Sequence, residues 1–217
     1  MPSPVSPKLL KGGLVLLDPD SSAVQRVIAL QYNPDEISRS FQISATGEGG
    51  DRSEAMRLKG PPVETIKLKA DMDAADQLEF PDQNATAVEV GLQAQLAVLE
   101  TIVYPTSTTL LANDALASAG MLEIVPMKAP LVLFVWSRSR IVPVRITEIS
   151  ITEKAFDPQL NPILAEVNLG LRVLSVDDLG FAGKGGSLYM AYQMQKEALA
   201  RRVTSAVLGD LGIQGSI

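Results

Sequence analysis

The chain has 217 residues, of which 46% are hydrophobic and 20% are charged, and its formal net charge is −6. This composition is typical of a soluble globular protein, and the acidic balance opposes phosphate backbones, which argues against a dedicated nucleic-acid-binding protein. The sequence contains neither histidine nor cysteine, which excludes disulfides, thiol chemistry, Ser-His-Asp catalysis and the usual zinc ligands.

The first part of the chain predicts short strands. Residues 14–17 and 24–32 read as an opening hairpin, separated by the turn-forming segment Asp18-Pro-Asp-Ser-Ser22. In the segment Tyr32-Asn-Pro-Asp-Glu36 the residue before proline is pushed to extended geometry, so we expect a turn there. Residues 37–45 then predict a third strand.

No segment reaches the ~18 consecutive apolar residues that suggest a membrane span, and no basic start followed by an apolar stretch is visible. We therefore expect a cytoplasmic protein without direct membrane insertion. Residues 46–61 are rich in glycine and charge and predict a loop that becomes ordered only in an assembly. Residues 62–70 alternate and predict a strand with one solvated face.

Without histidine and cysteine, catalysis would have to rest on carboxylates, lysine or tyrosine. The segment Asp71-Met-Asp73-Ala-Ala-Asp76 begins like a calcium loop but has Ala75 and Asp76 where a third ligand and the turn glycine belong. Glu148 and Glu153 could be imagined as a glycosidase pair, although such residues on an alternating strand usually form the wet face. We expect no catalytic residues, no metal and no cofactor.

Two glycine-rich segments, 47–50 and 183–187, match neither the phosphate loop nor the dinucleotide fingerprint. Both read as flexible joints.

One internal helix is predicted over residues 87–103, because apolar residues recur there every three or four positions: Val88, Leu92, Leu96, Leu99 and Val103. Pro105 ends it. Residues 106–129 are long for a connection in a compact domain, with one helical turn expected near 113–119. This segment is either an interface element or poorly ordered.

The run Leu131–Trp136 lacks polar alternation and predicts a strand covered on both faces. Residues 142–151 alternate, but the apolar set changes side at Thr147-Glu148, which predicts a β-bulge. After the break at 156–162, the alternation of residues 166–173 predicts another long strand. Strands of this length often reach past their subunit, so we expect the hairpin 131–176 to form an interface between copies.

The tail predicts a helix from Ser187 to Leu208 with one apolar stripe, which we expect to dock on the body or on a partner rather than in a membrane. The chain then divides into a β domain, residues 1–182, and a glycine-linked helical extension, residues 183–217. The candidate interface residues lie on the apolar strand and on this stripe: Leu131, Phe134, Val135, Trp136, Leu188, Tyr192, Leu199 and Val203.

The order of these parts resembles one family. An Asn33-Pro34 segment follows the first strands, Trp136 ends an inner strand, and Phe156, a turn and Pro162 precede a long strand. This pattern is similar to the tube-related baseplate proteins of phage-tail-like contractile injection systems, which include the contractile injection system tube-protein N-terminal domain. Ser137 stands where that family commonly has glycine, and the chain has no room for the C-terminal lysin-motif domain of many members.

The resemblance implies a mainly β fold with flanking α, namely a tail-tube-like β-barrel or two packed antiparallel sheets plus one helix, with a C-terminal helical extension. It implies a non-enzymatic ring of six copies at the tube–baseplate–spike junction of a contractile particle, which starts or caps the inner tube. The implied partners are other copies, the inner tube protein, the spike or hub protein and other baseplate proteins. Two alternatives stay open at this point: the inner tube protein itself, and a monomeric ligand-binding β-barrel.

Overall fold

The computed structural model describes residues 10–43, 58–120 and 129–203. The strands are β1 Gly13–Leu17, β2 Val24–Ala29, β3 Ile37–Gln42, β4 Val63–Asp73, β5 Leu131–Ser137, β6 Arg140–Glu153 and β7 Leu164–Val173. The helices are α1 Ala75–Leu78, the 3-10 turn η1 Pro81–Gln83, α2 Ala85–Val90, α3 Gln93–Val103, α4 Ser107–Ser118, α5 Val176–Leu179 and α6 Lys184–Ala200.

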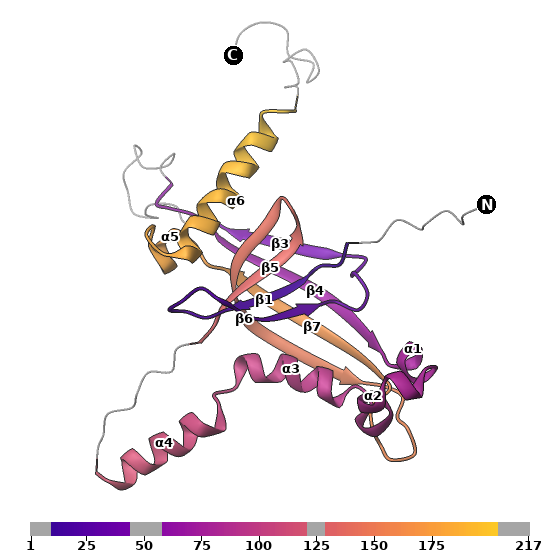
Figure 1. The fold of residues 1–217 in the computed structure, drawn as a ribbon. Coiled ribbons are helices and arrows are strands. Elements are labelled where there is room, and N and C mark those ends of the chain that lie inside the picture. Colours follow the sequence, from indigo (N-terminus) through magenta and orange to yellow (C-terminus); the bar gives the residue numbers. More distant parts are fainter. Residues whose placement is uncertain (1–9, 44–57, 121–128, 204–217) are drawn as a thin grey trace, which may run out of the picture.

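All seven strands form one antiparallel sheet in the order β2-β1-β5-β6-β7-β4-β3 (Figure 1). The expectation of a mainly β fold with flanking helices is confirmed. The sheet is open: within the described ranges no ladder joins β2 to β3, so these two strands are its edges. The prediction of a closed barrel or of two packed sheets is corrected to one continuous sheet.

A side-chain amide links the two ends of this open sheet. Gln31 Nε2 donates to the carbonyl oxygen of Asp73 at 2.6 Å, and the Asp73 N–H donates to Gln31 Oε1 at 2.9 Å. Gln31 follows β2, whereas Asp73 ends β4. The amide therefore bonds to the backbone of β4 as a neighbouring strand would. The sheet therefore curls around its apolar face.

The long β6–β7 hairpin has the register that the sequence predicts. Ile146 pairs with Leu171 and Glu148 with Gly170, so one residue is skipped at Thr147, which confirms the expected β-bulge. The alternating residues of β7 face the core: Val167, Leu169, Leu171 and Val173 are all buried. The reversal after β6 is held by Asp157, whose Oδ1 accepts the backbone N–H groups of Gln159 and Asn161.

The core lies between the apolar face of the sheet and two groups of helix residues: Leu92, Leu96 and Leu99 on one side, Tyr189 and Tyr192 on the other. Strand β5 is covered on both faces, as predicted, because Val132 and Phe134 belong to the core and Leu133 is also buried.

The single helix predicted over 87–103 is wrong in two respects: α2 and α3 are separate, and Val88 and Val103 of the predicted stripe are exposed. Gly91 between them has φ +57, and a Cβ at this position would overlap the carbonyl oxygen of Pro162. The same oxygen accepts a hydrogen bond from the N–H of Leu92 at 2.8 Å. In a continuous helix the N–H of Leu92 would bond to a carbonyl of the preceding turn, but here it bonds to the β6–β7 connection instead.

Two other helices differ from expectation. Residues 106–129 contain α4, a full helix capped by Thr106, and none of its residues is buried; it extends away from the sheet in Figure 1. The glycines of 183–187 are not a joint, because Gly183 precedes α6 while Gly185 and Gly186 are buried in its first turn. The expected mobility of 46–61 and of the end of 106–129, and the helix beyond Val203, fall largely outside the described residues.

Candidate assembly surfaces

The two edge strands are the first candidate surface. Every residue of β2 is exposed except the half-buried Ile28, and β3 is buried nowhere along its length. Val27 on β2 is 65% exposed and Phe41 on β3 is 47% exposed. A sheet edge with apolar side chains and unpaired backbone groups is a template for pairing with another chain.

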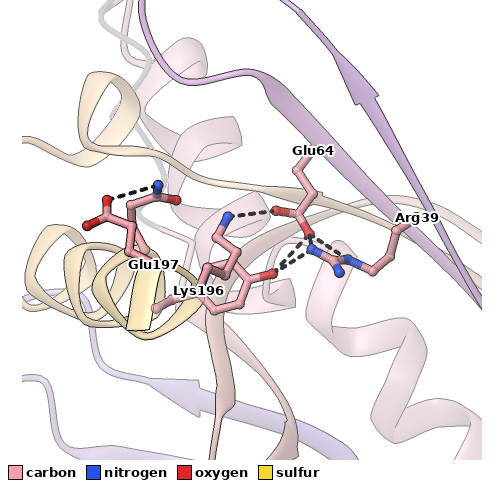
Figure 2. A network of polar contacts seen from close by, with 6 residues as sticks. Arg39, Glu64, Lys196 and Glu197 are labelled. Carbon is pink, nitrogen blue, oxygen red and sulfur yellow. Dashed lines mark hydrogen bonds and ion pairs between the residues drawn. The ribbon is translucent and has the colours of Figure 1, made fainter. Parts of the chain in front are cut away.

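The second candidate surface is α6, which is fixed to the β3 edge by a buried polar network (Figure 2). Arg39 of β3 donates from Nε and a terminal nitrogen to Glu64 Oε1 at 2.9 and 2.7 Å. It also donates to the hydroxyl of Tyr192 at 2.8 Å, and that hydroxyl donates to Glu64 Oε1 at 3.2 Å. Lys196 Nζ lies 3.8 Å from Glu64 Oε2.

The charges in this network balance: the Glu64 side chain is only 4% exposed, and the cations Arg39 and Lys196 both face its carboxylate. Burial, with the nearby carboxylate of Glu64, raises the pKa of Tyr192 to about 12, so the hydroxyl stays protonated and donates. Burial also lowers the pKa of Lys196, against the opposing effect of Glu64. The ammonium of Lys196 lies over the Tyr192 ring, 4.3 Å from its centroid.

The sequence reasoning missed Arg39 and Glu64. A signal for Glu64 was present, since it shares the inward face of β4 with Ile66, Leu68 and Ala70 at a spacing of two. A carboxylate on an otherwise apolar strand face predicts a buried cation or hydroxyl partner. The identity of the partners could not be read, because Tyr192 lies 128 residues further along the chain.

The structure separates the candidate interface residues by their exposure. Phe134 and Tyr192 are buried within the chain itself, and Trp136 stacks on Phe134 with ring centroids 6.2 Å apart. Leu131, Val135 and Leu188 are half-buried. Leu199 and Val203 are exposed. The strand residues and the helix residues of this set meet at the start of α6, where a Cβ added to Gly185 would lie 3.3 Å from the side chain of Leu131.

The acidic segments form no metal cluster: in the described ranges, no group of three or more carboxylates is placed to hold a metal ion. Asp71 and Asp73 belong to β4, whereas Asp76 belongs to α1. Glu148 and Glu153 pair with Gly170 and Ala165, which puts their backbones ~16 Å apart along one strand, against the ~5–9.5 Å between the carboxyl groups of a glycosidase. Glu148 is largely exposed and lies 3.9 Å from Lys67.

Across the described ranges, no helix is both long and apolar enough to cross a membrane. No family model matches the chain, and no curated protein matches it either. A chain of the solved structure "Tail of empty GTA particle computed with helical refinement, C6 symmetry" is similar at 14% identity and a TM-score of 0.29, over 75% of this chain and 90% of that chain.

Proposed function

We propose that this chain is a non-enzymatic structural subunit that assembles with copies of itself, β2 edge to β3 edge, into a closed ring of a phage-tail-like particle. The order of sequence parts around Asn33-Pro34, Trp136 and Phe156 supports the class of particle. The two open edges at opposite ends of one sheet support the mode of assembly, and this observation carries the proposal.

The physical reason is that the two edges differ, so a contact between them is head-to-tail. A contact between β2 of one copy and β3 of the next is heterologous, and such contacts close into a ring when the rotation permits. Closure removes both free edges, which would otherwise promote open-ended aggregation. The exposed apolar residues Val24, Val27 and Phe41 supply area to bury at the same contact.

Within such a particle we propose a ring of six at the junction of tube, baseplate and spike, where it starts or caps the inner tube. Helix α4, none of whose residues is buried, and the end of α6 are appendages beyond the sheet, which a uniform stack of identical layers does not require. They favour an adaptor, with the inner tube protein, spike or hub protein and other baseplate proteins as partners, over the inner tube protein itself.

Introduced cysteines test the edge contact cleanly because the chain has none of its own. Val27→Cys marks β2 and Ser40→Cys marks β3, and both positions are exposed. The two variants are mixed, treated with a bismaleimide and separated by denaturing electrophoresis. Each variant alone is the matched control.

We expect cross-linked dimers from the mixture and none from either variant alone, together with a ring-sized mass for the untreated protein by light scattering. Dimers from Val27→Cys alone would mean a β2–β2 contact and would overturn the head-to-tail ring. A monomeric mass at high concentration, without cross-links, would overturn the proposed function.

One observation favours a second candidate, a monomeric protein that binds a small apolar ligand. A pocket of about 520 Å³ lies between the first hairpin, β4, β7 and α3, and its lining includes Leu14, Leu30, Met72 and Leu99. This volume suits a drug-sized molecule. A monomeric mass combined with saturable uptake of a fluorescent apolar probe, abolished by Leu30→Arg, would favour this alternative.

A further inference from the structure

Helix α6 crosses the sheet towards its β3 edge. At its start, a Cβ on Gly185 would lie 3.3 Å from the side chain of Leu131, the first residue of β5. Further along, Tyr192 bonds to Glu64 of β4 and Arg39 of β3. The sheet order between these contacts runs β5-β6-β7-β4-β3, so the helix proceeds from the middle of the sheet to its last strand.

The remaining length of the helix carries it past that edge. Lys196 Nζ, one turn after Tyr192, still lies 3.8 Å from Glu64 Oε2 of β4, and from Lys196 to Ala200, where α6 ends, an α-helix rises a further ~6 Å, more than the ~4.8 Å spacing between neighbouring strands. Figure 1 shows the last turns of α6 clear of the sheet. In the described part of the chain, no strand lies beyond β3 to receive them.

One side of α6 keeps the same residue spacing from the part that lies on the sheet to the part that extends past it. Its residues recur at alternating spacings of three and four: Tyr189, Tyr192, Lys196, Leu199 and, in the turn that follows the helix, Val203. The two tyrosines are buried on the chain's own sheet, and Lys196 is half-buried. Leu199 is 46% exposed and Val203 is 73% exposed. The side that packs on the sheet therefore runs on beyond the edge, where no described residue covers it.

We infer that this end of α6 docks on the neighbouring copy, over the strand that the neighbour adds to β3. This inference rests on the proposed head-to-tail contact at that edge. A strand added to β3 would extend the same apolar face under Leu199 and Val203. The exposed cations Arg201 and Arg202 lie beside these residues and would approach a second copy whose overall net charge is −6.

The test compares two variants of the full chain. The double variant Leu199→Ser/Val203→Ser removes the two apolar side chains, both already exposed in the single subunit. Met194→Ser is the matched control, because Met194 is 57% exposed on the same helix but lies off this side. Far-UV circular dichroism and the melting temperature of the dilute subunit should match the wild type for both variants.

Sedimentation should then show self-association weakened by about tenfold or more in the double variant and unchanged in the control. Wild-type assembly by the double variant would overturn the inference. The Val27→Cys and Ser40→Cys mixture separates this result from failure of the proposed function. Cross-linking in the wild-type background together with wild-type association of the double variant rejects only the docking of α6, whereas absence of cross-linking rejects both.

Discussion

Arg39 and Glu64 form a diagonal pair across the β3–β4 ladder, with two Arg39 nitrogens donating to the single oxygen Oε1 of Glu64 at 2.9 and 2.7 Å. In the register, Arg39 lies opposite Ile66 and Glu64 lies opposite Phe41. The pair places a nearly buried carboxylate on the core side of the sheet, and the same oxygen is reached by the Tyr192 hydroxyl. The edge strand and the last long helix are therefore fixed through one side-chain oxygen.

Breaking this pair should destabilise the subunit. Glu64→Gln should lower the free energy of unfolding by about 2 kcal/mol, since Arg39 then faces a neutral acceptor in a site with little water. A double-mutant cycle with Arg39→Met, measured by urea denaturation, should give a coupling energy of roughly 1–3 kcal/mol. Additive effects of the two changes would show that the pair contributes nothing specific.

Removing the hydroxyl of Tyr192 tests the helix side of the same network. Tyr192→Phe should cost about 1–2 kcal/mol, because Glu64 and Arg39 each lose a hydrogen bond while the ring stays buried. Tyr189→Phe is the control: Tyr189 is also buried on α6, but its hydroxyl makes no hydrogen bond to another described residue. Equal effects of the two changes would contradict a specific role for the Tyr192 hydroxyl.

The acid dependence of stability should include a contribution from Glu166. Hydrogen bonds from Lys154 and then from Lys69 lower the pKa of Glu166 from 4.5 to about 2. Because the folded-state pKa lies below the ordinary value, this stabilisation is complete above about pH 4.5 and is lost as the pH falls towards 2.

Urea midpoints measured between pH 5 and 2 should therefore fall less steeply in Glu166→Gln than in the wild type. Glu148→Gln, at the exposed and longer contact with Lys67, should leave the slope unchanged. A slope of Glu166→Gln equal to that of the wild type would argue against this assignment.

The break between α2 and α3 should depend on Gly91. Gly91→Ala should destabilise the protein by more than about 1 kcal/mol, because the left-handed backbone disfavours a Cβ and the Cβ would overlap the Pro162 oxygen. Gly120→Ala is a matched control, since Gly120 also has a positive φ, +79, but no atom lies within 4 Å of the added Cβ. The melting temperature of Gly91→Ala should lie well below that of Gly120→Ala.

Truncation tests whether α6 belongs to the folding unit of the β domain. We expect residues 1–182 to fold, but with stability lowered by several kcal/mol, since burial of Tyr189 and Tyr192 is lost at ~1.5–3 kcal/mol for each large side chain. A chain that ends after Val203 should unfold at the wild-type urea concentration. If the shorter chain is unfolded in buffer, the helix belongs to the folding unit and the division at residue 182 is wrong.

Local patterns in the sequence were enough to locate most strands and the β-bulge in one of them. The alternation along β7, the apolar run of β5 and the change of side at Thr147 all survive in the structure, because burial of one sheet face imposes a period of two wherever the strand lies. In the helix pattern of residues 87–103, Leu92, Leu96 and Leu99 are buried as predicted, whereas Val88 and Val103 at its two ends are exposed. The same pattern could not reveal the break at Gly91, which is set by a carbonyl oxygen from residue 162.

What the sequence by itself determined is therefore the class of fold, the strands with a buried face and the absence of histidine and cysteine chemistry. Tertiary structure alone decided three further points: the strand order that leaves β2 and β3 as edges, the amide of Gln31 that joins the two halves, and the meeting of Arg39, Glu64 and Tyr192. The physical reason is that spacing along a chain reports only which side of an element is buried. Which distant element covers that side is fixed by packing and hydrogen bonding between segments far apart in sequence.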